Sequence, residues 1–166
     1  MTTDSPCANL IQRYVRTCGL RFLRGEPDGK YLCVADLRPR RLCVRLEISP
    51  SFSDVLAIRV TPAGTFPAVD RPWLTQMADT WNRQNREVTV IVRSSPDPQR
   101  TTVVARRNHW IAEGLSFEDF ASIADQTIAA AIEFFALLTP VVESALTAQP
   151  SRLVSERKAE RARVTA

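Results

Sequence analysis

The chain has 166 residues, of which 45% are hydrophobic and 24% are charged, as in an ordinary soluble globular protein. That length predicts one domain with a real hydrophobic core. Only five glycines and one histidine are present, which argues against a glycine-rich phosphate loop and against a multi-histidine metal site. The polar residues 1–9 contain no apolar export segment, so we expect a cytoplasmic protein.

The first predicted helix begins at Pro6, after a cap at Asp4 or Ser5, and stops at Gly19. Its apolar stripe comprises Cys7, Leu10, Ile11, Tyr14, Val15 and Cys18. We interpret the four cysteines of the chain as buried, reduced thiols, because none of them shows a CxxC spacing. A contact between Cys33 and Cys43 is an open alternative, because both fall in neighbouring predicted strands.

Three or four short strands follow, separated by turns at residues 26–29, 38–40 and 49–51. The clearest strand covers residues 41–48 and alternates apolar with polar residues. Leu42, Val44, Leu46 and Ile48 share one face, whereas Arg41, Cys43, Arg45 and Glu47 share the other. Leu56, Ile58 and Val60 repeat the pattern, with Arg59 on the opposite face. This alternation predicts an antiparallel sheet with one buried face and one wetter face.

A second helix and a hairpin are predicted between residues 72 and 111. Pro72 suits the first helical turn. Leu74, Met77, Ala78 and Trp81 then fall on one helical face, so we expect Leu74, Met77 and Trp81 in the core. Residues 88–92 alternate as a strand, residues 94–98 form a proline-rich turn, and residues 102–111 form the return strand.

The last predicted helix is long and unusually apolar. Ser116 caps it, and Asp119 completes an aspartate version of the capping box. Its main stripe comprises Phe120, Ile123, Ala124, Ile128, Ala131, Phe135 and Leu138, and Ile132, Phe134 and Leu137 widen the apolar surface. Pro140 predicts a kink or break near Thr139. The apolar run is shorter than the ~20 residues of a membrane span, and Glu133 interrupts it, so we predict a core helix.

No arrangement of residues in the chain is typical of an active site. His109 is the single histidine, so it would have to serve any Ser-His-Asp triad, and no serine occupies a sharp elbow between a strand and a helix. We interpret His109 as a surface or half-buried strand residue. We therefore predict a protein without enzymatic activity, catalytic residues, metal or cofactor.

Positive charge is concentrated after residue 150. Residues 151–166 hold five basic and two acidic residues, and we predict a flexible tail that is either solubilising or in contact with nucleic acid or anionic lipid. Arg106 and Arg107 beside Trp110 suggest a platform on which bases stack, but strand alternation places Arg106 and Trp110 on one face and Arg107 on the other.

The order of helices and strands, together with two motifs, resembles the YbjN family, whose members are described as proposed bacterial sensory transduction regulators. The motifs are Leu74-x6-Trp81-Asn82-x3-Arg86 and Glu113-Gly114-Leu115-Ser116-x-Glu118. The resemblance covers about residues 5–145. The fold of that family is similar to that of type III secretion chaperones, which are small α+β homodimers that bind polypeptides. The resemblance implies no cofactor and no catalytic residues.

We predict a single α+β domain over residues 1–149, with a twisted antiparallel sheet, helices packed on one face and the order α-β-β-β(-β)-α-β-β-α. The tail begins at residue 150. The predicted function is protein binding, as a chaperone-like or regulatory adaptor, and the alternative is a nucleic-acid-binding regulator that uses the tail and the arginine pairs. We expect a homodimer. The predicted partner or dimer surface comprises Arg45, Arg59, Ile91, Arg93, Ile132, Phe134 and Leu137, and the structural core includes Leu74, Met77, Trp81, Phe120 and Phe135.

Overall fold

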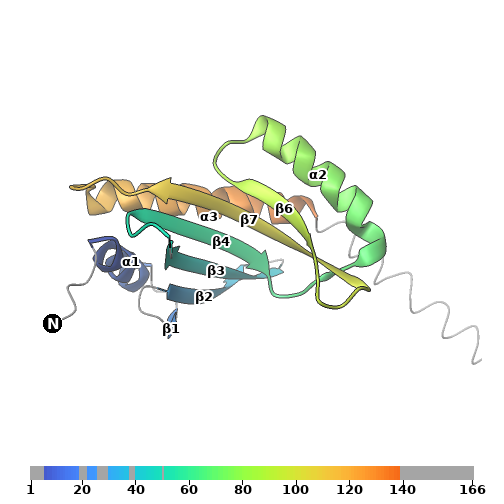
Figure 1. The fold of residues 1–166 in the computed structure, drawn as a ribbon, viewed down its shortest axis with the longest axis horizontal. Coiled ribbons are helices and arrows are strands. Elements are labelled where there is room, and N and C mark those ends of the chain that lie inside the picture. The colour runs from blue at the N-terminus through green and yellow to red at the C-terminus, as the bar shows by residue number, and fades with distance from the viewer. Residues whose placement is uncertain (1–5, 19–21, 26–29, 38–39, 50, 139–166) are drawn as a thin grey trace, which may run out of the picture. The chain divides into compact units, whose positions relative to one another are not determined.

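The computed structural model of the chain describes residues 6–18, 22–25, 30–37, 40–49 and 51–138 (Figure 1). The described elements are, in order, α1 (Pro6–Thr17), β1 (Phe22–Gly25), β2 (Lys30–Leu37), β3 (Arg40–Ile48), β4 (Val55–Pro62), β5 (Phe66–Pro67), η1 (Ala68–Asp70), α2 (Arg71–Gln84), β6 (Thr89–Ser94), β7 (Arg100–Trp110) and α3 (Phe117–Leu137). These elements confirm the predicted α+β class.

The strands form one antiparallel sheet in the order β1-β2-β3-β4-β7-β5, and β6 pairs with the other edge of β7. Seven strands take part within the described residues, against the five or six expected, because the sheet includes the two-residue strand β5. All neighbouring strands run antiparallel.

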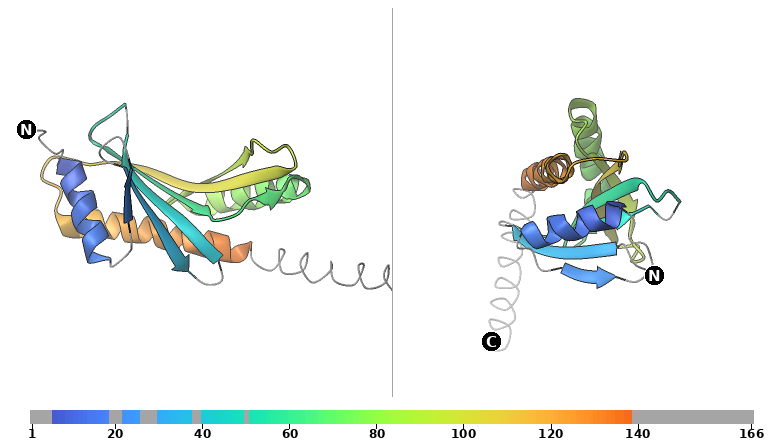
Figure 2. Two further views of the ribbon diagram at one scale, coloured as in Figure 1. Left: turned by 90° about the horizontal axis from the view of Figure 1, so that it is seen from below. Right: turned by 90° about the vertical axis from the view of Figure 1, so that its left-hand side faces the viewer.

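The register divides the side chains of the sheet into two faces. Val44 lies opposite Val60 and Leu46 opposite Ile58, and each of these four side chains is at most 1% exposed. We call their side the covered face, because α1, α2 and residues 117–133 of α3 pack on it (Figure 2). The opposite side is the open face, which no helix of the described chain covers. This arrangement confirms the predicted packing of helices on one face.

Helix α2 packs on β6 through the predicted stripe. Leu74 and Trp81 are buried, with exposed fractions of 1% and 6%, whereas Met77 is only half-buried. The side chain of Asn82 then reaches the backbone of Val90, where its Oδ1 accepts the N–H at 2.8 Å and its Nδ2 donates to the carbonyl at 2.9 Å. Strand β6 lies at the edge of the sheet, so Asn82 occupies the hydrogen-bonding groups that another strand would use.

Helices α1 and α3 contact each other beside the sheet. The Tyr14 hydroxyl donates to Asp125 Oδ1 at 2.6 Å, and its ring meets Phe120 edge to face at 6.0 Å between centroids. The Arg13 guanidinium lies 4.1 Å from the centroid of Phe117. Burial, followed by the hydrogen bond to Asp125, raises the pKa of Tyr14 well above its usual value.

The start of α3 has the predicted capping geometry. Gly114 adopts a φ of 82° in a turn that a hydrogen bond from Leu115 N–H to the Ala112 carbonyl closes at 3.2 Å. Ser116 Oγ then accepts the Asp119 N–H at 3.1 Å and donates to Asp119 Oδ2 at 2.8 Å. The capping interaction predicted from the sequence is confirmed.

By length and composition alone, α3 is apolar enough to cross a membrane, a criterion that core helices of soluble proteins also meet. Phe120, Ala124, Thr127 and Ala131 are buried at successive turns of the helix. A core helix therefore explains its composition. The kink predicted near Thr139 and the tail from residue 150 lie outside the described residues.

The chain divides into two compact units, Met1–Glu133 and Phe134–Ala166, and the described part of the second is residues 134–138. Phe134 and Phe135 lie edge to face, 5.5 Å apart between centroids. Phe134 is completely buried, so its predicted exposure on a partner surface is wrong. Leu137, in contrast, is 49% exposed.

The cysteines only partly follow the prediction. Cys7 is buried, and burial raises the pKa of its thiol to about 11. Cys18 is exposed, because α1 ends at Thr17 and the stripe no longer faces the core there. Cys43 is a free thiol opposite Val34, while Cys33 lies opposite Val44. The two cysteines of β2 and β3 are therefore not paired across the strands.

Candidate functional site

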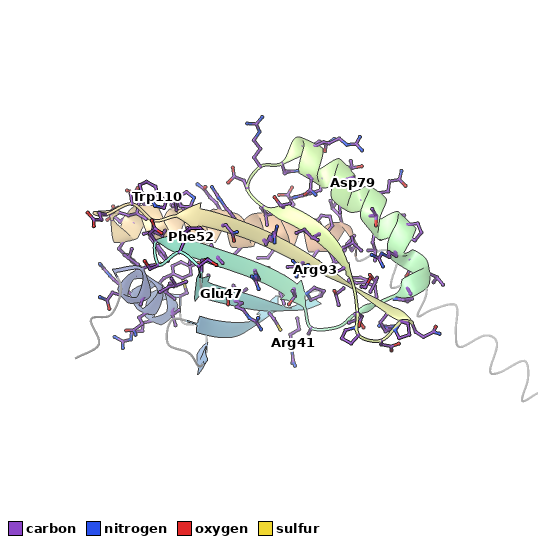
Figure 3. All side chains as sticks on the ribbon, viewed as in Figure 1. Arg41, Glu47, Phe52, Asp79, Arg93 and Trp110 are labelled. Atoms are coloured by element: carbon purple, nitrogen blue, oxygen red, sulfur yellow. The ribbon has the colours of Figure 1, made fainter. Side chains whose placement is uncertain are left out.

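The open face is the largest polar side-chain surface that the described strands present. Figure 3 shows its side chains projecting from β3, β4, β6 and β7. Its residues with described side chains include Cys43, Arg45, Glu47, Ala57, Arg59, Thr61, Ile91, Arg93, Val104, Arg106 and Asn108. Four of the predicted surface residues, Arg45, Arg59, Ile91 and Arg93, are thus brought to one face by three different strands.

Three arginines form a line across the centre of this face. Arg45 lies opposite Arg59, and Arg59 lies opposite Arg106. Adjacent strands are about 4.8 Å apart, so the three side chains leave the sheet at neighbouring positions. We call these three residues the arginine row. Like charges directly opposite each other destabilise a sheet, so the row is not explained by stability.

A single acidic side chain accompanies the row among the described open-face residues. Glu47 is 5% exposed, and its Oε1 lies 3.2 Å from Arg59 Nη2. Its neighbour across the strands is Ala57, whose small side chain leaves room for the Arg59 guanidinium to approach. No carboxylate in the described part of the chain forms an ion pair with Arg45 or Arg106. The row therefore keeps a surplus of positive charge.

A shallow groove of about 330 Å³ runs beside the arginine row. Its lining comprises Cys43, Arg45, Arg59, Thr61, Arg93 and Val104. Guanidinium groups from β3, β4 and β6 therefore border a floor made by a thiol, a hydroxyl and a small apolar side chain. Such a groove offers several hydrogen-bond donors to an anionic group and an apolar contact beneath it.

An exposed aromatic residue ends the same face. Trp110 lies four residues beyond Arg106 on β7 and is 63% exposed. Its Nε1 donates to Asp54 Oδ2 at 2.6 Å, which fixes the ring against the loop between β3 and β4. Phe52 of that loop is also 63% exposed (Figure 3). The open face thus combines a basic centre with an apolar end.

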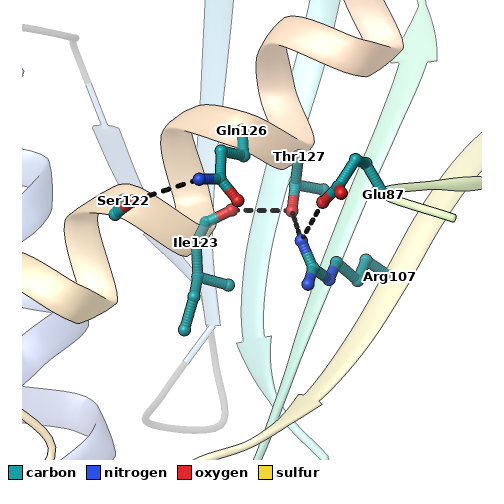
Figure 4. A network of polar contacts seen from close by, with 6 residues as sticks. All are labelled: Glu87, Arg107, Ser122, Ile123, Gln126 and Thr127. Carbon is teal, nitrogen blue, oxygen red and sulfur yellow. Dashed lines mark hydrogen bonds and ion pairs between the residues drawn. The ribbon is translucent and has the colours of Figure 1, made fainter.

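Arg107 belongs to the opposite side of the sheet. Its Nη1 donates to Glu87 Oε2 at 3.0 Å and to Thr127 Oγ1 at 3.4 Å (Figure 4). Thr127 in turn donates to the Ile123 carbonyl at 2.7 Å. The network connects β7 with α3 and holds Arg107 in a structural role. The alternation predicted for Arg106 and Arg107 is confirmed, although both arginines also border one hollow at the edge of β7.

His109 lies near this network and is half-buried, as predicted. Burial, followed by the positive charge of Arg107, lowers the pKa of its imidazole. Together with Glu87 and Arg107 it borders a polar hollow of about 410 Å³. Among the described residues, no group of three His, Cys, Asp or Glu side chains is placed to hold a metal ion. We find no nucleophile hydrogen-bonded to His109 in that same part of the chain.

The remaining predicted surface residues lie on α3. Ile132 is half-buried, Leu137 is half exposed and Phe134 is buried. Of the predicted surface, only Arg45, Arg59 and Arg93 line the arginine groove, and Phe134 and Leu137 belong to the second compact unit.

The roles of three residues were not predicted from the sequence. Glu47, Asp54 and Asn82 acquire their roles through an ion pair, an indole hydrogen bond and an edge contact, respectively. The sequence placed Glu47 on the same face as Arg45 and Asn82 in the first of the two motifs, but it did not predict their partners. Asp54 lies in a loop, whose contacts periodicity does not describe.

Solved structures show what this fold is similar to. YbjN from E. coli, a proposed transcription regulator, is 10% identical with a TM-score of 0.58, covering 76% of this chain and 86% of YbjN. An uncharacterized protein from Methanothermobacter thermautotrophicus is 11% identical with a TM-score of 0.53, covering 81% and 97%. A chain of the ExsC–ExsE complex is 16% identical with a TM-score of 0.48, covering 81% and 94%. No protein-family model and no curated protein matches the sequence. The predicted YbjN-like fold is confirmed.

Proposed function

We propose that this protein is a non-enzymatic protein-binding module, a chaperone-like or regulatory adaptor of the YbjN type. The observation that carries the proposal is the open face, where a groove between arginines lies on the side of the sheet that no described helix covers. The similarity to YbjN, described as a proposed transcription regulator, supports a regulatory protein rather than a catalyst. We also propose a cytoplasmic location.

The composition of the open face suits a protein interface. Arginine and tryptophan are enriched where protein partners contribute most binding energy, and both are accessible here at Arg93 and Trp110. The face is a rigid support, because β3, β4 and β7 are held by continuous ladders on both sides. A partner would therefore meet a preformed surface and lose little binding energy to ordering it.

Site-specific crosslinking tests the proposal. A photoreactive amino acid at Thr61 or Ile91 places the probe on the open face, and one at the exposed Gln76 of α2 serves as the matched control. In cells of the native host, we expect the two open-face probes to capture the same protein and the α2 probe to miss it. Equal capture from all three positions, or none from the open face, would contradict the proposal.

A nucleic-acid-binding regulator is the second candidate function, and the arginine row is the observation that favours it. Phosphate contacts release counterions, so DNA or RNA affinity that depends on them falls steeply as salt rises. Binding of labelled DNA and RNA to the full chain at 50 and about 200 mM salt measures this. Affinity that collapses by about 10³-fold and disappears in Arg45→Gln would favour this candidate.

We further propose a homodimer. Two arginine rows cannot face each other without like-charge repulsion, so we assign the dimer contact to the apolar α3 residues Ile132 and Leu137 rather than to the open face. Light scattering coupled to size exclusion gives the mass directly. A mass near the 18.6 kDa of one chain at every concentration tested would exclude the dimer.

A further inference from the structure

The open face carries positive charge that the described chain does not neutralise. Arg45, Arg93 and Arg106 have no carboxylate partner within the described chain, and Glu47 compensates only Arg59. Because the row is unfavourable for the sheet by itself, an anion bound over it would remove repulsion that the free protein carries.

The groove chemistry matches carboxylates particularly well. A guanidinium group presents N–H donors in a planar fork that binds a carboxylate through two hydrogen bonds. Arg45, Arg59 and Arg93 border one groove, and the Thr61 hydroxyl adds another donor. Val104 supplies an apolar floor for the methylene groups of an acidic side chain.

Two occupants from the chain itself are disfavoured by charge. A second copy of the open face would bring a second arginine row against the first. The C-terminal residues 151–166, with five basic and two acidic side chains, carry the same sign of charge as the groove. Neither occupant complements the positive charge of the groove, which favours a different, acidic molecule.

A nucleic acid fits the face less well than a protein does. Binding of single strands relies on aromatic rings placed among the basic residues. The aromatic Trp110 is four residues, or about 13 Å, along β7 from the arginine row. Its indole N–H is held by the carboxylate of Asp54, whose negative charge would repel a phosphate backbone there. An apolar side chain of a polypeptide meets no such repulsion at Trp110 and Phe52.

We propose that the open face binds an acidic segment of a partner protein, with its carboxylates in the groove of Arg45, Arg59 and Arg93 and an apolar side chain on Trp110. This inference rests on the proposed protein-binding function and adds the chemical class of the partner. Trp110 lies four residues along β7 from the arginine row and six from Val104 of the groove, so the carboxylates and the apolar residue of the partner are separated by about four to six extended residues.

Fluorescence anisotropy with a labelled oligoglutamate peptide that ends in leucine and phenylalanine tests the inference on the full chain. An oligolysine peptide of equal length and oligothymidylate are the comparison probes. We expect the acidic peptide to bind, and to bind at least tenfold more weakly to the double variant Arg45→Gln/Arg93→Gln. Arg83→Gln/Arg86→Gln, which removes the same charge from exposed positions on α2 and just beyond it, should bind as the unmodified protein does.

Alkylation of the cysteines gives a second measurement. Cys43 lies in the groove, so bound acidic peptide should slow its reaction with iodoacetamide several-fold, while the exposed Cys18 on the far end of α1 reacts at an unchanged rate. Peptide mapping by mass spectrometry separates the two sites. Equal protection of Cys18 and Cys43 would overturn the inference.

Three other results would also overturn it. These are equal losses in the two arginine double variants, tighter binding of oligothymidylate than of the acidic peptide, and acidic-peptide binding that Trp110→Ala leaves unchanged. The protein-binding function itself has a separate test. The crosslinks from the open face can also be repeated in the variant Arg45→Gln/Arg93→Gln. If a partner is captured and its crosslinking yield is the same in that variant, the protein-binding function stands and the acidic class of the partner is wrong.

Discussion

The two faces of the sheet differ in the burial and the charge of their side chains. On the covered face, Val44, Leu46, Ile58 and Val60 are at most 1% exposed and contribute hydrophobic stabilisation. On the open face, Arg45 and Arg59 alternate with them at directly opposite positions and contribute repulsion. The same alternation therefore places stabilising apolar side chains on one face of the sheet and the proposed binding surface on the other.

This difference predicts that truncations on the two faces have unequal effects on stability. Trp81→Ala should lower the free energy of unfolding by about 3–5 kcal/mol, because the indole fills the space between α2 and β6 and leaves a cavity. Ile91→Ala, on the open face of β6, should lower it by less than about 1 kcal/mol. Urea unfolding followed by circular dichroism measures both. Similar losses of unfolding free energy in the two variants would mean that Ile91 also packs in the core of the protein without a partner.

The Tyr14–Asp125 hydrogen bond should have the next largest effect. Tyr14→Phe should cost about 1–2 kcal/mol, because the buried tyrosine loses its hydroxyl and the hydrogen bond to the Asp125 carboxylate. The pKa of Tyr14 is raised in the folded protein, so its contribution is fully present below the ordinary tyrosine pKa of about 10 and is lost as pH rises above it.

Unfolding of the unmodified protein and of Tyr14→Phe at pH 8 and at about pH 10.5 tests this sign. The difference in stability between the two proteins should shrink at the higher pH. A difference that grows with pH would show that the hydroxyl is not held in its neutral form. Asp125→Asn is the control, since it keeps the size of the acceptor and removes its charge.

Asn82→Ala should lower stability by roughly 1 kcal/mol, because the Val90 N–H and carbonyl each lose a partner at the edge of the sheet and gain only water. It should also expose an unprotected edge and increase self-association. Asn108→Ala, an exposed change on the open face, is the control. Unchanged scattering at high concentration would show that other residues protect the β6 edge.

The smallest effect is expected at Arg106 of the arginine row, where removal of the charge should not lower stability. Arg106→Gln should leave stability unchanged or raise it by about 0.2–1 kcal/mol, because a like-charge neighbour of Arg59 disappears. Arg59→Gln should instead lower it, since the buried Glu47 loses its cation. Thermal unfolding of the two variants compares them. A clear loss in Arg106→Gln would mean that the row stabilises the free protein.

Much of the fold follows from local sequence patterns. Alternation identified β3, β4 and the two faces of the sheet, and helical spacing identified the buried side of α2 with Leu74 and Trp81. The cap at Ser116 was also predictable, because capping depends on residues only three positions apart. These features need no knowledge of which elements become neighbours.

The tertiary structure alone decided which residues from different strands meet. The sequence predicted Arg45, Arg59 and Arg93 as outward-facing, but only the register of β3, β4 and β7 aligns Arg45, Arg59 and Arg106 in one row. Exposure was also undecided at the ends of helices: Phe134 is buried and Cys18 is exposed, although both were expected otherwise. Periodicity specifies the face of an element, whereas pairing register and packing partners are long-range properties that a one-residue shift would change completely.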